Sequence, residues 1–288
     1  MPFVKRAGQP DIHYTVDDYT DPWRNAPYLI LQHGFGRSGR FWYSWVPYLA
    51  RFFKVVRPDI RGLGQSSADF DLERDFTIDA CIGDLVAIMD QLGAGSAGSG
   101  AMSVHYCGES MGGILGMALA ATHPARVRTL TLVSSPVFIG SATRQTYSLG
   151  YASQEEAQQN MGMQAWVAAT NRTTRFPPSV DPGLLAWYEE EFARNNPKVQ
   201  QAMGKVFHGI SAEPYLPHIE APVLGLYPTG GPITSADQEA ILTSKIKNLR
   251  MVHLPSSFHK VQLVFPAACA GHLLHFAAQF DGTSCHES

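Results

Sequence analysis

The stretch Tyr106-Cys107-Gly108-Glu109-Ser110-Met111-Gly112-Gly113 decides the fold of this chain. It contains the pattern G-x-S-x-G, with an apolar run before it and a helical pattern from Ile114 to Ala120 after it. A strand, a sharp turn and a helix in this order form a nucleophile elbow, which holds the hydroxyl of its central serine clear of the sheet. Glycines flank the serine because a Cβ would clash where strand and helix approach each other. Ser110 is therefore the predicted nucleophile.

The composition of the chain indicates a single large domain, or a domain with an insertion. Of 288 residues, 45% are hydrophobic and 16% charged, which fits a sizeable core. A net charge of −3 without a basic run argues against a nucleic-acid partner. No apolar segment could span a bilayer and residues 1–9 lack a signal-peptide core, so we expect a cytoplasmic protein without a membrane partner.

Four scattered cysteines without a C-x-x-C pair favour free thiols. We expect a small-molecule substrate and neither a cofactor nor a metal ion. Self-association into a homo-oligomer is left open.

Apolar runs alternate with helical patterns around the elbow, and this order predicts a mostly parallel sheet with helices on both faces. The expected strands are 2–6, 11–16, 28–33, 52–57, 102–107, 128–133, 222–227 and 249–254. The expected helices are 39–49, 77–92, the segment after Ser110, 235–246 and 261–280.

The alternation stops between residues 137 and 217, where the pattern is mostly helical and strand-like runs are absent. We interpret this segment as a helical cap inserted into the sheet domain. The predicted organisation is a core formed by residues 1–136 and 218–288, interrupted by the cap at 137–217.

A serine hydroxyl needs a neighbouring base, which in elbow proteins is a histidine on the loop after the last strand. His259 has this position, whereas His253 lies inside the strand. His272 and His275 have i, i+3 spacing on the final helix but no third ligand, so we expect them on the helix surface.

The tetrahedral intermediate of such a reaction also needs two N–H donors for its oxyanion. The predicted donors are the backbone groups of Met111, directly after the nucleophile, and of Phe35, on the loop that follows the strand at 28–33.

Together, the motifs His33-Gly34-Phe35-Gly36, Phe41-Trp42, Arg57-Pro58-Asp59-Ile60-Arg61-Gly62-Leu63-Gly64-Gln65-Ser66 and Cys107 to Gly113 resemble the α/β-hydrolase superfamily. The chain most resembles its 3-oxoadipate enol-lactonase and small carboxylesterase branch. The resemblance is dense over 28–135, traceable over 222–280 and nearly absent in the cap.

This resemblance implies an α/β-hydrolase fold and a serine hydrolase that cleaves a small ester, lactone or amide through an acyl-enzyme on Ser110, with His259 as general base. The cap supplies much of the pocket in this family. Trp166 in the predicted cap and Trp42 in the predicted sheet domain are candidate substrate-binding residues.

The resemblance implies an acidic residue that orients the base, and here the sequence departs from the family. Gly231 occupies the usual acid position, and the segment Val133-Ser134-Ser135-Pro136-Val137 offers no carboxylate either. Three explanations remain open. A carboxylate from elsewhere in the chain, such as Asp237 or Glu239, reaches His259; or a neutral partner or water orients the ring in a Ser–His dyad; or ordinary hydrolytic power has been lost.

Three further side chains have open roles in the sequence. Glu109 precedes the nucleophile and either brings a negative charge to the pocket or points away into the sheet layer. Arg37 and Arg40 either bind a substrate carboxylate or are solvated. The alternatives to ester hydrolysis are C–C bond hydrolysis or other non-ester chemistry on the same site, and a non-catalytic protein that binds a small ligand.

Overall fold

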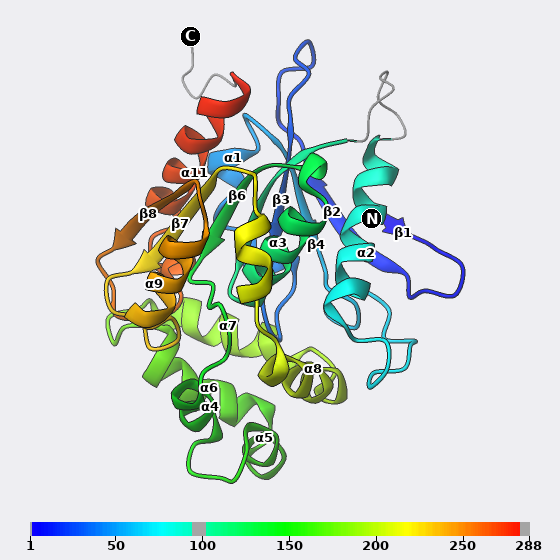
Figure 1. Ribbon diagram of the computed structural model, residues 1–288. Helices are drawn as coiled ribbons and strands as arrows, with labels where there is room; N and C mark the ends of the chain where they lie inside the picture. The colour runs from blue at the N-terminus through cyan, green and yellow to red at the C-terminus, as the bar shows by residue number, and fades with distance from the viewer. Residues whose placement is uncertain (1, 94–101, 283–288) are drawn as a thin grey trace.

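The computed structural model describes residues 2–93 and 102–282 and contains an eight-stranded sheet (Figure 1). The strand order is β1-β2-β4-β3-β5-β6-β7-β8. Strand β2 pairs antiparallel with β1 and β4, and the pairs from β4 to β8 are all parallel. The strands are β1 (Phe3–Val4), β2 (Ile12–Asp17), β3 (Tyr28–Gln32), β4 (Lys54–Pro58), β5 (Val104–Glu109), β6 (Val127–Val133), β7 (Val223–Pro228) and β8 (Leu249–Leu254). The mostly parallel sheet is confirmed.

Helices cover both faces of this sheet (Figure 1). One hydrophobic cluster joins the sheet to α2 (Ile78–Gly93), α3 (Met111–Thr122) and α9 (Ala236–Lys245). A second cluster joins the opposite face to α1 (Val46–Leu49) and α11 (Pro266–Asp281). The central strands are buried on both faces, which explains their continuous apolar sequences.

Two predicted helices are interrupted by proline. The pattern over 39–49 forms a 3₁₀ turn, η1 (Gly39–Trp42), and the short α1, which has Pro47 in its first turn. The final helix is divided into α10 (Val261–Val264) and α11, which begins at Pro266. Proline has no N–H to donate within a helix and is tolerated only in the first turn, so each proline starts a new helix. The sequence over residues 93–100, which consists of glycine, alanine and serine, predicts a short connector before β5, and all of it except Gly93 lies outside the described residues.

The segment between β6 and β7 forms a helical layer at one end of the sheet (Figure 1). It contains α4 (Ser141–Ser148), α5 (Gln154–Met161), α6 (Met163–Thr170), the π-helical turn η3 (Asn171–Arg175), α7 (Pro182–Ala193), α8 (Pro197–Gly209) and η4 (Glu213–His218). The two ends of this layer meet, because the Ala212 N–H donates to the Val137 carbonyl at 2.7 Å. A third cluster packs its aromatic residues Trp166, Tyr188 and Phe192 against Phe41 of the core.

Three cysteines in the described part of the chain, Cys81, Cys107 and Cys269, are buried free thiols. Within the same residues, no helix combines the length and the apolar character needed to cross a membrane.

Candidate active site

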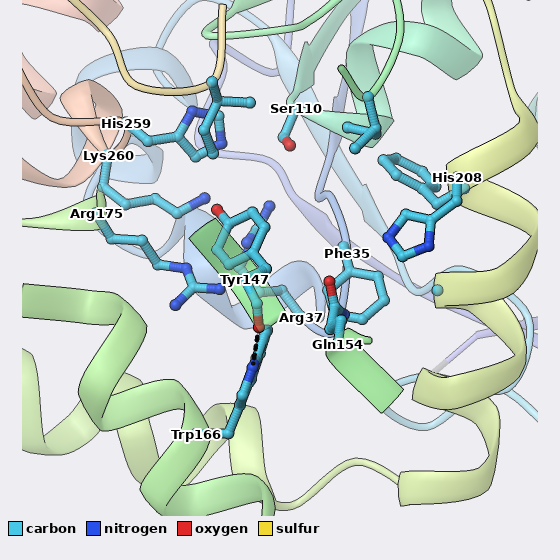
Figure 2. Close-up of a pocket in the computed structure, with 14 residues that line it drawn as sticks. Phe35, Arg37, Ser110, Tyr147, Gln154, Trp166, Arg175, His208, His259 and Lys260 are labelled. Atoms are coloured by element: carbon cyan, nitrogen blue, oxygen red, sulfur yellow. Dashed lines mark hydrogen bonds between the residues drawn. The ribbon is translucent and has the colours of Figure 1, made fainter. Parts of the chain in front are cut away.

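Ser110 stands at the turn between β5 and α3 with the backbone angles φ 55° and ψ −118°. Few non-glycine residues adopt a positive φ, and such strain is typical of a nucleophile elbow. A Cβ at Gly108 would overlap the Gly112 carbonyl oxygen, and a Cβ at Gly112 would overlap the Gln32 carbonyl oxygen. The two glycines therefore allow strand and helix to approach, and Ser110 lines the adjacent cavity (Figure 2).

The loop after β3 lies directly against this elbow. A Cβ at Gly34 would be 2.7 Å from the carbonyl oxygen of Glu109. Burial lowers the pKa of His33 to about 4, so its ring is neutral. The neutral ring donates to the Gly34 carbonyl through Nδ1 (2.9 Å) and accepts the Ile60 N–H at Nε2 (3.0 Å). His33 thus braces the loop that carries Phe35.

The two predicted oxyanion donors lie on these two segments. Met111 is the first residue of α3, where a backbone N–H has no acceptor within the helix. Phe35 follows Gly34 and lines the same cavity as Ser110. The helix dipole of α3 also directs its positive end at this site.

His259 lies on the loop between β8 and α10, and its side chain is buried in the wall of the cavity that Ser110 lines (Figure 2). Its backbone N–H donates to the Thr174 carbonyl at 2.9 Å, which connects this loop to the cap. Burial, together with the charge of Lys260, lowers the pKa of the imidazole to about 3. The ring is therefore neutral at ordinary pH, as a general base must be.

Glu109 is the carboxylate beside His259. Its Oε1 lies 3.3 Å from His259 Nε2 and accepts a hydrogen bond from Lys260 Nζ at 2.5 Å, while its Oε2 accepts from Arg37. Burial alone would raise the pKa of this carboxyl, but the charges of Arg37 and Lys260 hold it well below its usual range. Glu109 is not among the residues that line the cavity, but its carboxylate contacts three residues that do, Arg37, His259 and Lys260.

The pKa values of the two basic groups around Glu109 shift in opposite directions. Burial lowers the pKa of Arg37, but Glu109 together with Tyr188 and Tyr147 outweighs burial, so that the pKa is raised. For Lys260, burial and the Arg37 charge lower the pKa well below its usual range, although Glu109 opposes them. Arg40, the other arginine of this loop, instead binds Glu191 at 2.9 Å and is largely exposed.

No carboxylate takes the place of the family's usual acid at position 231. Among residues 2–93 and 102–282, Glu109 is the only one with a carboxylate oxygen within 4.0 Å of a His259 ring nitrogen. Glu239 instead contacts His253 Nε2 at 2.8 Å, and Asp237 is exposed in the first turn of α9. A carboxylate from elsewhere in the chain does lie beside His259, but it belongs to Glu109 and not to Asp237 or Glu239.

The cap contributes aromatic residues and a cation to the cavity. Trp166 lines it and donates from Nε1 to the Tyr147 carbonyl at 2.8 Å (Figure 2). The guanidinium of Arg175 lies over the rings of Tyr147, Trp166 and Phe192, 5.2, 5.3 and 5.7 Å from their centroids. Neither Arg175 nor Lys260 was predicted from the sequence, although the position of Lys260 directly after the predicted base was an available signal.

Trp42, the other candidate substrate-binding residue, is not among the residues that line this cavity. It is buried in the cluster between the sheet and helices α1 and α11, where its ring packs edge-on against Trp45 with centroids 4.8 Å apart. The remaining histidines considered for the site, His272 and His275, are exposed on α11. In the described part of the chain, no three His, Cys, Asp or Glu side chains are grouped to hold a metal ion.

A mostly parallel sheet, a strained serine between strand and helix, and a histidine on the loop after the last strand define an α/β-hydrolase. The alpha/beta hydrolase fold family matches residues 27–266, and the chain belongs to this family.

Individual relatives carry several hydrolase names. A protein of Azorhizobium caulinodans named carbamate hydrolase RutD is 24% identical over 98% of this chain and 100% of its own length. The pimeloyl-[acyl-carrier protein] methyl ester esterase of Aeromonas hydrophila is 32% identical over 40% of each chain. The solved enol-lactonase of Burkholderia xenovorans LB400 superposes with a TM-score of 0.81 at 26% identity, over 96% of this chain and 99% of that one.

Proposed function

We propose that this chain is a serine hydrolase that cleaves a small ester, lactone or amide through an acyl-enzyme on Ser110. The observation that carries this proposal is the strained Ser110 at the elbow, in the wall of the same cavity as the neutral, buried His259. The similarity to relatives named as hydrolases of carbamates, esters and lactones supports the same reaction class.

In the proposed reaction, His259 accepts the hydroxyl proton of Ser110 as the serine oxygen attacks the substrate carbonyl. The backbone N–H groups of Phe35 and Met111 stabilise the negative charge that develops on the carbonyl oxygen. The imidazolium then donates its proton to the leaving group, which leaves an acyl-enzyme. A water molecule, deprotonated by His259, hydrolyses that ester and restores the serine.

Glu109 acts in this proposal as the carboxylate that stabilises the imidazolium. Protonation of His259 is disfavoured by burial and by the charges of Lys260 and Arg37. The Glu109 carboxylate, 3.3 Å from Nε2, opposes these effects and is itself held ionised and in place by the two cations. The residue before the nucleophile thereby takes over the electrostatic task that Gly231 cannot perform.

The test is covalent labelling with an organophosphonate that resembles the tetrahedral intermediate. Wild-type protein should incorporate one equivalent on Ser110, located by peptide mass spectrometry. The variants Ser110→Ala and His259→Ala should lose the label, while His253→Ala should keep it, because His253 lies on the exposed side of β8 against Glu239.

Folded wild-type protein that takes no label would contradict the proposal. Product analysis with an ester and a vinylogous diketone distinguishes ester cleavage from C–C bond cleavage. A ligand that raises the melting temperature without being converted would indicate a binding protein instead.

A further inference from the structure

The cavity at Ser110 has a second polar wall, on the side away from His259. It is formed by Gln154 of α5 and by His208 in the last turn of α8, which line the cavity together with Phe35. Figure 2 shows these three side chains on one side of the cavity and His259 on the other. Gln154 and His208 have no part in the reaction proposed above, so their place in the wall needs another explanation.

Gln154 is a buried amide without a protein partner. The residue is 6% exposed, and within residues 2–93 and 102–282 its side chain forms no hydrogen bond. Its Nε2 lies near α8, because a Cβ at Gly204 would be 3.7 Å from this atom and 3.9 Å from Cε2 of Phe35. Buried polar groups in native proteins nearly always have a hydrogen-bond partner. Because Gln154 lines a cavity, we expect this partner to be a molecule in that cavity.

His208 adds a second hydrogen-bonding group to the same wall. Burial lowers the pKa of its imidazole, although the charge of Glu155 opposes this effect, so the ring is neutral at pH 7. A neutral imidazole has one donor nitrogen and one acceptor nitrogen. The contact between His208 Nδ1 and Glu155 Oε1, at 3.9 Å, is too long for a hydrogen bond. In the part of the chain that the structure describes, both ring nitrogens of His208 are therefore available to a ligand.

The charges near this wall favour a neutral ligand group. The Oε1 atom of Glu155 is buried near Gly204 without a hydrogen bond among the described residues, and its charge disfavours an anion here. Arg175 lines the same cavity with a guanidinium that keeps its charge, which disfavours a cation. The side chain of Gln154 has an NH2 donor and a carbonyl acceptor in one plane. The neutral group that matches both at once is another amide.

We propose that the substrate carries, besides the ester or lactone that Ser110 attacks, a carboxamide that is not cleaved, and that Gln154 and His208 bind this carboxamide. This inference rests on the proposed function. Gln154 and the carboxamide each donate one N–H to the carbonyl oxygen of the other, and His208 accepts the second N–H of the carboxamide. The side chains of Ile139 and Phe207, which line the same cavity, contact the apolar chain between the carboxamide and the ester.

The experiment compares methyl glutaramate with methyl 5-methylhexanoate, two neutral esters of similar shape that end in a carboxamide and in an isopropyl group. Wild-type protein should have the higher kcat/KM for methyl glutaramate, because the apolar ester leaves Gln154 without a partner. Gln154→Leu should lower the ratio of the two kcat/KM values by about tenfold or more, and His208→Phe by about threefold. The matched control is Gln159→Leu, an exposed glutamine of the same helix, which should leave the ratio unchanged.

The outcomes separate this inference from the proposed function. Equal wild-type kcat/KM for both esters, a preference for the apolar ester, or an unchanged ratio in Gln154→Leu would overturn the carboxamide site while Ser110 remained labelled by the phosphonate. If neither ester is hydrolysed and Ser110 takes no label, the proposed function fails. Whenever neither ester is hydrolysed, binding of valeramide decides the inference. It should raise the melting temperature of wild type but not of Gln154→Leu, and no shift in wild type would overturn the inference.

A second measurement covers a Gln154→Leu variant that does not fold. Valeramide should inhibit the wild-type reaction competitively, or stabilise the wild-type protein if no reaction is found. The ketone 2-hexanone has a methyl group in place of the NH2 group and no N–H to donate, so its effect should be at least about fivefold weaker. Equal effects of valeramide and 2-hexanone would overturn the inference.

Discussion

Replacement of Glu109 by glutamine removes one negative charge next to His259 and nearly preserves the side-chain shape. The carboxylate oxygen lies 3.3 Å from His259 Nε2. At an effective dielectric constant of about 20, two unit charges at this separation interact by about 5 kcal/mol. Because the imidazolium exists only once the reaction has begun, this energy is lost mainly from the transition state. It corresponds to a fall in kcat of between about 10³-fold and 10⁴-fold, similar to the loss when a triad carboxylate is neutralised.

The matched control is Asp84→Asn. Asp84 is also a buried carboxylate that binds two cations, Arg61 and Arg6, but it lies on α2 away from the cavity. Each substitution leaves two cations without their anion, and breaking a buried ion pair costs about 3–5 kcal/mol of folding free energy. Both variants should therefore have lower melting temperatures in circular dichroism, but only Glu109→Gln should lose kcat in an ester assay.

Two results would refute this role of Glu109. A folded Glu109→Gln protein that retains kcat within about tenfold of wild type would show that its charge does not support the base. Equal losses of kcat in Glu109→Gln and Asp84→Asn would show a general effect of instability. Conversely, partial recovery of kcat when Gly231→Asp is added to Glu109→Gln would show that the loss came from the missing carboxylate beside His259. The new Cβ at position 231 would be 2.7 Å from Pro228 Cγ, so the proline ring must shift.

Two further predictions follow from the same geometry. Because the folded-state pKa values of His259 (about 3) and His33 (about 4) lie below the ordinary 6.5, kcat/KM should show no protonation limb near pH 6.5. Below pH 6.5 the unfolded chain binds more protons than the folded chain. The free energy of unfolding, measured with urea, should therefore fall by about 1.4 kcal/mol per histidine for each pH unit from 6.5 towards 4. A free energy of unfolding that is constant or rises over this range would contradict the lowered pKa values. Gly112→Ala should prevent correct folding, because its Cβ would overlap the Gln32 carbonyl oxygen. The control Gly271→Ala on α11 should be tolerated, because the new Cβ meets no atom within 4 Å. A soluble Gly112→Ala protein with the wild-type melting temperature would contradict the close approach of Gly112 to Gln32.

Local patterns in the sequence were sufficient to predict the fold and to single out Ser110 and His259, which the structure places in one cavity. A strand buried on both faces must be apolar throughout, and a strained elbow must have glycines beside its serine, so these constraints are visible in neighbouring residues. Ser110 and His259 could be predicted because their positions follow from the order of strands. The helix breaks at Pro47 and Pro266 were missed because apolar spacing was followed across a residue that cannot donate a backbone hydrogen bond.

The electrostatics of the cavity required the tertiary structure. Apolar periodicity reports which face of an element is buried, but it does not report which charges meet there. Glu109, Arg37 and Lys260 are brought together by β5, the loop after β3 and the loop after β8, which only the strand order makes neighbours.

The same limit applies to the two tryptophans and to Arg175. Trp42 and Trp166 both follow helical spacing, yet one packs in the core and the other lines the cavity. Arg175 resembles any polar residue of a cap helix until its turn is hydrogen-bonded to the loop of His259. The sequence determined where the proposed nucleophile and base lie, because the elbow glycines mark Ser110 and the order of strands marks the loop of His259. The carboxylate beside His259 and the charges around the cavity depend on contacts between distant parts of the chain.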